Sequence, residues 1–450
     1  TYPSGLAVEL LSLNKSYFEI QRLRYRPDTL AFLDTIKSQH FQDSTTPPSC
    51  SQELQESLPN LCRIPDVSIF KGEATSSPPL KIGVLLSGGQ APGGHNVVIG
   101  LFDGLRAFNP KSRLFGFIKG PLGLIRGLYK DLDISKIYDY YNVGGFDMLS
   151  SSREQITTKE QKSTILATVK KLKLDGLLII GGNHSNTNTA MLAEYFLEHN
   201  CSIPVIGVPK TIDGDLKNHW IETSLGFHTS CRIYSEMIGN LMKDTLSIKK
   251  YHHFVRLMGQ RASYTTLECG LQTQPNITLI SEHIAIRKLS LKQLCKHIAL
   301  SLISRYRSGK NYSTMLIPEG LIKHISDTRK LIYELNLLLL KQKLPLEKLL
   351  EKLSPEALKT FRSLPPEIAQ QILTARDSYG NILVSKISTE ELLATLVKKE
   401  IHKIDPQMDF SPVAHFFGYE SRAGFPSNFD SNYGIALGIF SALFLVRKKT

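Results

Sequence analysis

The sequence is poor in cysteine and lacks the short motifs that mark several common protein classes. Its six cysteines are spread over 450 residues without a C-x-x-C pair, which argues against a zinc ribbon and a dense disulfide framework. It contains neither the G-x-G-x-x-G fingerprint nor the GxxxxGK[ST] P-loop, so dinucleotide-binding proteins and ordinary nucleotidases lose their main support. Long-period repeats and low-complexity tracts are also missing. We therefore expect a globular protein from a reducing, cytoplasmic compartment.

Long hydrophobic runs are scarce as well. The longest, residues 435–446 (IALGIFSALFLV), is shorter than the roughly 18 residues of a spanning helix. We therefore expect a buried C-terminal helix and no membrane partner. Nothing near Thr1 has the basic, apolar and small-residue order of a secretory signal.

The charge balance is basic, with 54 Lys and Arg against 41 Asp and Glu and a formal net charge of +13. Such a charge favours anionic partners in general, among them nucleic acids, anionic membranes and phosphorylated metabolites. No recognised nucleic-acid motif accompanies it, so we expect no nucleic-acid partner. The length predicts two or three domains with a large core.

The order of patterns predicts four parts along the chain. Residues 1–75 form an N-terminal extension, interrupted by TTPPSCS at residues 45–51. Residues 76–320 alternate short apolar runs, glycine-rich loops and helical spacing, which is typical of parallel βαβ units. Residues 321–408 are rich in leucine, lysine and glutamate and predict a helical insert divided by prolines. Residues 409–450 return to the α/β pattern.

Three predicted strands each lead into a polar loop. The runs KIGVLL, GLLII and PVIGV precede SGGQAPGGHN, GGNHSNTNTA and PKTIDGD, respectively. Because ligands of open α/β sheets bind outside the carboxyl ends of the strands, we expect these loops to lie at one sheet edge.

Each loop has a functional and a plain structural interpretation. The first can hold an anion on backbone N–H groups or can be only a tight turn. Ser185 in the second can cap the following helix. In the third, Lys210, Thr211, Asp213 and Asp215 are the groups that phosphoryl transfer needs, yet Asp-Gly-Asp alone could be a solvated turn.

In this order, the motifs GVLLSGGQAPGGHN, GGFDMLSSSR, GGNHSNT, PKTIDGDLKN, KYHHFVRLMG, IPEG and GYESRAGFPSNFD resemble the long pyrophosphate-dependent phosphofructokinases of plants and bacteria. The resemblance runs from about residue 81 to residue 437. It implies two doubly wound, parallel-sheet α/β lobes of the phosphofructokinase type, with a helical insert and an N-terminal extension.

The resemblance also implies roles for individual residues. Asp213 would be the base for the 1-hydroxyl of fructose 6-phosphate, with Lys210 and Thr211 as its catalytic neighbours. The residues expected to bind pyrophosphate are Gly88, Gly89, Arg153, His184 and Lys210. Those expected to bind the sugar phosphate are Thr211, Ile212, Asp213, Lys250, Tyr251, Met258, Gly259, Gln260, Glu319, Tyr419 and Arg422. Asn183 and Asp215 would hold Mg²⁺. Lys250 and Tyr251 match a pair presented to a neighbouring subunit, which implies a homodimer or higher oligomer.

The sequence departs from the family pattern at three places. GGNHSNT stands where the family has GGDDSNT, so Asn183 and His184 replace two carboxylates, and Gln260 replaces an arginine that contacts phosphate. The loss of one such contact typically costs about 1.5 to 3 kcal/mol. Members of the family also continue beyond the position of Thr450, so this member is either shortened or incomplete there.

Two enzymatic interpretations and one regulatory interpretation follow. The first is reversible transfer of a phosphoryl group from pyrophosphate to fructose 6-phosphate in cytoplasmic glycolysis. The second is the same transfer with ATP as the donor. Asn183 and Gln260 support the alternative of a catalytically weakened or regulatory paralogue that pairs with an active subunit in a hetero-oligomer. The intact Lys210, Thr211, Asp213 and Asp215 support the enzyme.

Overall fold

The computed structural model describes residues 16–45, 49–218, 221–341, 346–376 and 380–450. The chain divides into two compact units. Unit 1 comprises Thr1–Ile212, Leu216–Thr229 and Arg422–Thr450, and unit 2 comprises Asp213–Asp215 and Ser230–Ser421. The units are thus interleaved along the chain, whereas the four parts expected from the sequence follow one another in order.

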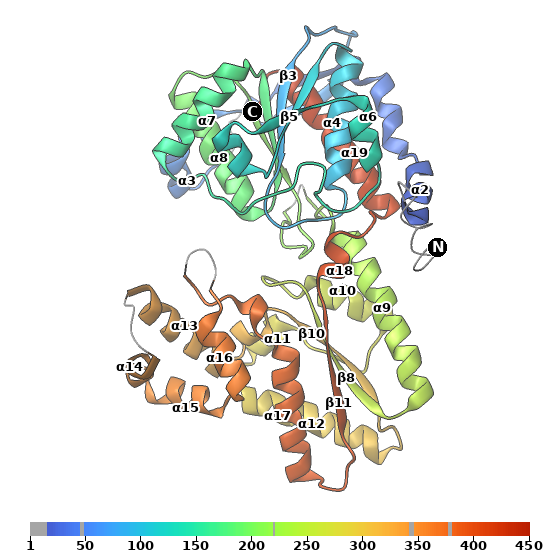
Figure 1. Cartoon of the computed structure of the whole chain (residues 1–450), viewed down its shortest axis with the longest axis vertical. Helices are drawn as coiled ribbons and strands as arrows, with labels where there is room; N and C mark the ends of the chain where they lie inside the picture. The colour runs from blue at the N-terminus through green and yellow to red at the C-terminus, as the bar shows by residue number, and fades with distance from the viewer. Residues whose placement is uncertain (1–15, 46–48, 219–220, 342–345, 377–379) are drawn as a thin grey trace, which may run out of the picture. The chain divides into compact units, whose positions relative to one another are not determined.

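Unit 1 is built on a five-stranded sheet in the order β5-β4-β3-β6-β7 (Figure 1). All neighbouring strands are parallel except β5, which runs antiparallel to β4. The strands are β3 (Lys81–Leu86), β4 (Arg113–Phe117), β5 (Tyr129–Leu132), β6 (Gly176–Gly181) and β7 (Val205–Pro209). The three predicted strands therefore correspond to β3, β6 and β7, which are neighbours in the sheet.

Helices cover both faces of this sheet because its strands are apolar on both sides. Ile82, Val84 and Leu86 of β3 face α4 (Gly94–Phe108) and α19 (Asn428–Val446). Leu85 faces the opposite layer. The helices of that layer are α5 (Pro121–Arg126), α7 (Lys159–Leu172) and α8 (Asn183–Glu198). The doubly wound α/β lobe expected from the sequence is confirmed.

The apolar C-terminal run lies in α19, which packs along α4. By length and composition α19 could cross a membrane, yet 56% of its apolar window is buried in the protein. A methyl group at Gly438 would overlap the backbone of Val97, so the two helices approach closely at this glycine. The prediction of a buried helix is confirmed.

The N-terminal extension packs on unit 1. Asn142 donates to the backbone oxygens of Arg22 and Tyr25 at 2.9 and 2.8 Å, and the ring centroids of Phe32 and Phe440 are 5.0 Å apart. The two prolines of the 45–51 break lie outside the described residues. The extension contains α2 (Tyr17–Arg24), η1 (Asp28–Asp34), η2 (Ile36–Ser38), β1 (Gln39–Asp43), α3 (Gln52–Ser57), η3 (Leu61–Arg63) and β2 (Val67–Lys71), with β1 and β2 antiparallel.

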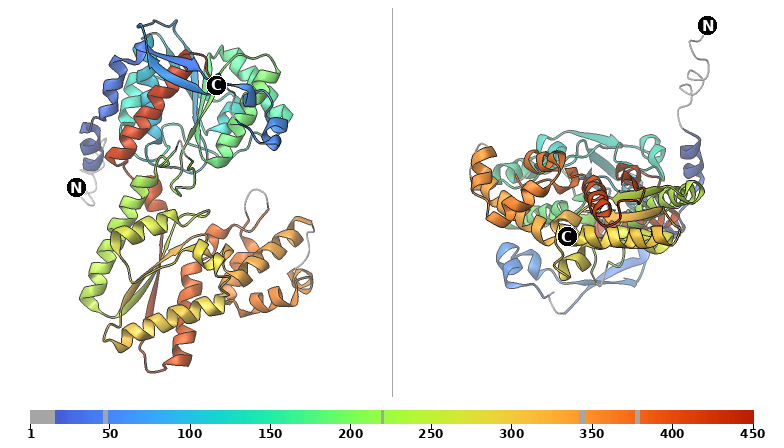
Figure 2. Two further views of the ribbon diagram at one scale, coloured as in Figure 1. Left: turned by 180° about the vertical axis from the view of Figure 1, so that it is seen from behind. Right: turned by 90° about the horizontal axis from the view of Figure 1, so that it is seen from below.

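Unit 2 is built on a parallel four-stranded sheet in the order β11-β8-β10-β9. Its strands are β8 (Tyr251–Leu257), β9 (Ile277–Thr278), β10 (Ser313–Pro318) and β11 (Ser411–Phe417). The helices α12 (Leu291–Arg307) and α17 (Thr389–Ile404) share a core with Phe254, Met315 and Ile317 of the sheet. This sheet is the second α/β lobe (Figure 2).

Between β10 and β11 the chain is helical, as the composition of residues 321–408 predicts. Pro355 and Pro366 each open a helix, where the missing N–H costs nothing. Besides α17, this segment contains η5 (Leu321–Lys323), α13 (Ser326–Lys341), α14 (Leu346–Glu351), α15 (Pro355–Ser363), α16 (Pro366–Thr374) and η6 (Val384–Lys386). The remaining elements of the two units are α6 (Ile134–Ile137), η4 (Tyr138–Tyr140), α9 (Phe227–Ile248), α10 (Tyr264–Thr273), α11 (Ser281–Ile286) and α18 (Tyr419–Arg422).

Acidification is expected to destabilise unit 1 through His95 in the first turn of α4. Burial lowers the pKa of His95 to about 4. The neutral ring is 3.1 Å from the Val143 oxygen through Nδ1, and Nε2 accepts from the Met148 N–H at 3.4 Å. Protonation of Nε2 would therefore place two donors against each other. The unfolded chain binds this proton near pH 6.5, so the free energy of unfolding should fall as the pH drops from 6.5 to 4.

The gap between a pKa of 6.5 and one of about 4 corresponds to about 3 kcal/mol. Urea unfolding at pH 7.5 and pH 4.5 measures most of this loss, and His95→Gln should make it smaller. The matched control is His283→Gln, because His283 is exposed on α11. An equal loss in His95→Gln and wild type would contradict the assignment.

Candidate active site

The first glycine loop of unit 1 leaves β3 and is fixed by backbone hydrogen bonds. Ser87 N donates to the Ile180 oxygen at 2.8 Å, and Gly88 N donates to the Ser152 oxygen at 3.0 Å. Gly88 has a φ of 77°, a left-handed conformation that favours glycine. The loop is therefore held in a defined shape and is more than a simple turn.

Two cations lie against this loop. Lys210 Nζ donates to the Gly89 oxygen, although the lysine is only 5% exposed. A side chain at Gly89 would overlap the Arg422 guanidinium. Gly88, Gly89, Lys210 and Arg422 are thus brought together in unit 1, where they can receive an anion.

The second glycine loop leads into α8. Gly182 occupies the N-cap position without a side-chain cap, and Asn183 and His184 stand in the first turn. The interpretation of Ser185 as the cap of this helix is wrong, because Gly182 occupies the N-cap position. Ser185 lies inside the first turn, and its Oγ is 2.8 Å from Ser87 Oγ, which ties the two glycine loops together. The N-terminus of a helix favours an anion through its free N–H groups and its dipole.

The ammonium of Lys210 lies between the two loops. A methyl group at Gly88 would stand 4.0 Å from Nζ, and one at Gly182 would stand 3.8 Å from it. Loops that end β3, β6 and β7 therefore meet at one edge of the sheet, and this prediction is confirmed.

Three other predicted residues of unit 1 lie around this edge. Arg153 is exposed. It follows Ser152, which forms an isolated β-bridge with Ser87 of the first glycine loop. Thr211 N donates to the Leu225 oxygen at 3.1 Å, and Ile212 is buried.

The chain passes from unit 1 to unit 2 between Ile212 and Asp213. Asp213 Oδ2 accepts a hydrogen bond from Gln260 N at 3.2 Å. The side chain of Asp215 is 11% exposed, and its Oδ2 is 3.9 Å from Arg261 Nε. The alternative of a solvated Asp-Gly-Asp turn is therefore wrong, because both carboxylates have protein partners.

The carboxyl ends of β8 and β10 present the next predicted residues. Met258 and Gly259 follow β8, and Glu319 follows β10. Glu319 is fully buried, and its Oε2 accepts from Gly259 N at 3.1 Å. The next peptide N–H, that of Gln260, donates to Asp213. The carboxylates of Glu319 and Asp213 therefore hold two consecutive N–H groups.

Lys250 and Tyr251 lie elsewhere in unit 2. They stand at the amino end of β8, so about 25 Å of strand separates them from Met258. Their side chains contact each other, with Lys250 Nζ 5.9 Å from the Tyr251 ring centroid. Tyr419, after β11, is 66% exposed and is therefore no core aromatic.

The sequence analysis missed two buried charged residues beside Glu319. Arg256 lies within β8 and Glu390 lies in α17, and they form an ion pair with Nε and Oε2 2.5 Å apart. Arg256 could have been recognised from the sequence, because an arginine stands within the strand-like run YHHFVRL. Glu390 could not, because nothing distinguishes it from the other glutamates of its segment.

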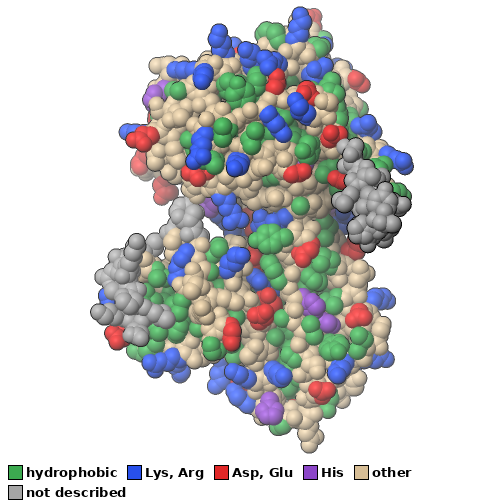
Figure 3. All heavy atoms as spheres, in the orientation of Figure 1, with side chains coloured by type: hydrophobic (Ala, Val, Ile, Leu, Met, Phe, Trp, Pro, Cys, Tyr) green, Lys and Arg blue, Asp and Glu red, His purple; other side chains and the backbone are tan. Residues whose placement is uncertain are grey.

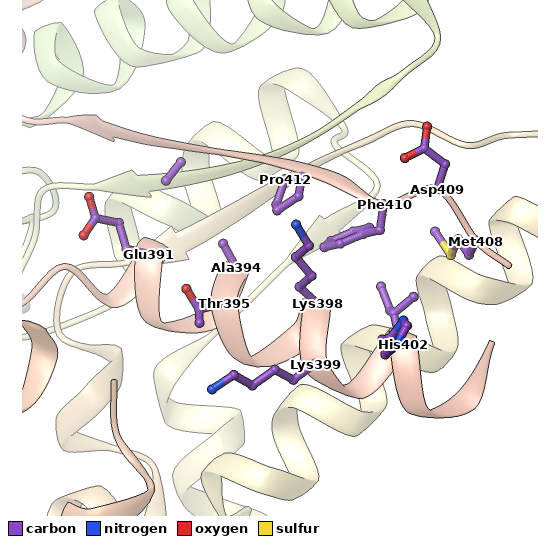
Figure 4. A pocket seen from close by; sticks show the side chains of 12 residues that line it. Glu391, Ala394, Thr395, Lys398, Lys399, His402, Met408, Asp409, Phe410 and Pro412 are labelled. Carbon is purple, nitrogen blue, oxygen red and sulfur yellow. The ribbon is translucent and has the colours of Figure 1, made fainter. Parts of the chain in front are cut away.

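A pocket in unit 2 lies between α17 and β11 (Figure 4). Lys398, His402, Phe410 and Pro412 are among its lining residues. None of the predicted site residues lines it, so this pocket is separate from the candidate site.

Positive charge is spread over the visible surface. On the face shown in Figure 3, lysine and arginine side chains alternate with acidic ones and form no continuous stripe. This face gives no support for a nucleic-acid interface.

Each unit is an α/β lobe with a sheet of mainly parallel strands, and unit 1 carries the glycine loops. This is the architecture of phosphofructokinases, and comparison with known proteins agrees with it. Residues 81–445 match the family model described as phosphofructokinase, and the chain belongs to this family. The chain is 43% identical over 450 residues to the pyrophosphate–fructose 6-phosphate 1-phosphotransferase of Porphyromonas gingivalis, covering 97% of this chain and 82% of the relative.

Plant relatives are named as subunits. The chain is 45% identical to pyrophosphate–fructose 6-phosphate 1-phosphotransferase subunit beta 2 of Arabidopsis thaliana, covering 96% of this chain and 78% of the relative. It is 40% identical to subunit alpha from Solanum tuberosum, covering 87% and 64%, respectively. A solved structure of the pyrophosphate-dependent phosphofructokinase from Marinobacter aquaeolei shares the fold, with a TM-score of 0.57, 15% identity and coverage of 82% and 77%.

Proposed function

We propose that the protein transfers a phosphoryl group from pyrophosphate to the 1-hydroxyl of fructose 6-phosphate. The products are fructose 1,6-bisphosphate and phosphate, and the reaction is a reversible step of glycolysis. Relatives that are 43% and 45% identical carry the name of this activity. The observation that carries the proposal is the segment Lys210–Asp215, which places a buried ammonium on the glycine loop of unit 1 and a hydrogen-bonded carboxylate in unit 2.

Unit 1 supplies the groups for pyrophosphate. Gly88 and Gly89 allow phosphate to approach the backbone, and the N-terminal end of α8, where His184 lies, favours an anion through the helix dipole. Lys210 neutralises charge on the transferring phosphoryl group, and Arg153 contacts phosphate. A bulky residue at position 184 disfavours ATP.

Unit 2 supplies most groups for the sugar phosphate. Asp213 accepts the proton of the 1-hydroxyl, and the hydrogen bond from Gln260 N keeps the carboxylate in place. The residues that bind the sugar phosphate are Thr211, Ile212 and Arg422 of unit 1 and Met258, Gly259, Gln260, Glu319 and Tyr419 of unit 2. Lys250 and Tyr251 serve the site of a neighbouring subunit.

We include Mg²⁺ as the cofactor. The described residues contain no preformed group of three or more His, Cys, Asp or Glu for a metal. Mg²⁺ commonly binds one or two protein ligands together with substrate phosphates. A carboxylate, as in Asp215, and an amide oxygen, as in Asn183, are ligands of the kind that Mg²⁺ accepts. We therefore assign these two residues to the metal, which would neutralise negative charge on pyrophosphate.

The assembly and the compartment are part of the proposal. Plant relatives named as subunits alpha and beta support an oligomer, either of identical chains or with a paralogue. Sparse cysteine supports the cytoplasm.

The test is the formation of fructose 1,6-bisphosphate from fructose 6-phosphate with Mg²⁺ and either pyrophosphate or ATP. We expect turnover with pyrophosphate, none above background with ATP, and loss of activity when EDTA removes the metal. Turnover with ATP alone would replace the proposed donor. Binding of fructose 6-phosphate by the folded protein without turnover would instead favour the regulatory paralogue.

A further inference from the structure

The predicted substrate residue Glu319 is held in a buried network of charged groups in unit 2. Glu319 is 0% exposed, and an ionised carboxylate in such a place needs a compensating charge. The Arg256 guanidinium provides it, because Arg256 Nη1 lies 3.9 Å from Glu319 Oε1. The other oxygen, Oε2, accepts from Gly259 N.

Arg256 is itself fixed by the helical segment. Nε and Nη2 lie 2.5 and 3.3 Å from the two carboxylate oxygens of Glu390 on α17, and Nη1 donates to the Ser385 oxygen at 3.2 Å. The guanidinium also stacks on Phe416 of β11, with its central carbon 3.9 Å from the ring centroid. The planar fork of an arginine reaches all these partners together, which a lysine cannot do.

The separation of 3.9 Å between Arg256 and Glu319 is longer than a hydrogen bond. Glu390 competes with Glu319 for the same guanidinium and holds it at this distance. Without the charge of Glu390, Arg256 would be drawn onto Glu319 and would pull that carboxylate away from Gly259 N. The loop of residues 258–260 would then lose its anchor, and the hydrogen bond from Gln260 N to Asp213 would be disturbed.

We propose that Arg256 and Glu390 are positioning residues for the fructose 6-phosphate site. They act through Glu319 on the loop that carries Gly259 and Gln260. The helical segment of residues 321–408 thereby takes part in acceptor binding through Glu390. This inference rests on the proposed function and adds two residues to it.

The test replaces Glu390 with glutamine, which keeps the size of the side chain and removes its charge. We expect Glu390→Gln to raise the KM for fructose 6-phosphate about tenfold, a change equivalent to about 1.4 kcal/mol. The KM for pyrophosphate should stay unchanged, because its predicted site lies in unit 1. Arg256→Lys should have the same signature, since lysine retains the charge but not the fork. Glu391→Gln is the matched control, because Glu391 is exposed on the same helix.

If Arg256 and Glu390 had a purely structural role, their variants would have a lower melting temperature and unchanged KM values for both substrates. That result would overturn this inference and leave the proposed function standing. Calorimetric titration with fructose 6-phosphate provides a second readout. If wild type binds the sugar phosphate without turnover and Glu390→Gln binds it about tenfold more weakly, the positioning role holds and the proposed activity fails. A wild type that binds no sugar phosphate would overturn both.

Discussion

Asp213→Asn is expected to lower kcat for transfer from pyrophosphate to fructose 6-phosphate by about 1,000-fold. Asparagine keeps an oxygen that can accept from Gln260 N, so the loop geometry survives. Its amide cannot take up the proton of the 1-hydroxyl at neutral pH. The KM for fructose 6-phosphate should therefore change little, because the lost interaction belongs to the transition state.

Steady-state kinetics of fructose 1,6-bisphosphate formation measures this effect, and near-wild-type melting and sugar-phosphate binding show that the variant is intact. Asp244→Asn is the matched control, because Asp244 is an exposed carboxylate on α9 outside the site. A kcat within about tenfold of wild type would mean that another group accepts the proton.

The α/β architecture could be predicted because its signals are local. The runs that form β3, β6 and β7 are apolar, short and followed within two residues by glycine or proline, so their positions and their common edge follow from the sequence. The ordered motifs then place Gly88, Gly89 and Lys210 on that edge. The structure brings these residues together.

The interleaving of the two units could not be predicted from local patterns. The segment Asp213–Asp215 belongs to unit 2 while its neighbours on both sides belong to unit 1, and Arg422–Thr450 returns to unit 1 after β11. Such a division depends on tertiary contacts between residues far apart in the sequence. The same is true of the Arg256–Glu390 pair, whose members are separated by 134 positions.

The substitution at Gln260 has a different meaning once the structure is known. The sequence suggested the loss of a phosphate contact, because a neutral side chain replaces an arginine. In the structure, the backbone N–H of Gln260 bonds Asp213, a contact that any residue except proline can make. The neighbouring Arg261 lies 3.9 Å from Asp215. The substitution therefore leaves the hydrogen bond to the proposed base in place.

Lys210→Met is expected to lower kcat with pyrophosphate by about 100- to 1,000-fold. Lys210 Nζ lies between the two glycine loops, bonds the Gly89 oxygen and is shielded from water. A cation in such a place is already oriented toward the charge that develops on the phosphoryl group, and low exposure strengthens its effect. Methionine fills a similar volume without the charge.

The measurement compares kcat and both KM values of Lys210→Met with those of Lys171→Met, whose lysine is exposed on α7 of the same unit. Loss of the bond to the Gly89 oxygen should also lower the free energy of unfolding by about 1 to 3 kcal/mol. The variant Lys210→Arg distinguishes the effect on stability from the effect on catalysis. Its guanidinium restores a positive charge and a hydrogen-bond donor, but it is too large for the space between the glycine loops. A Lys210→Met enzyme that keeps wild-type kcat with reduced stability would show that this ammonium only fastens the loop.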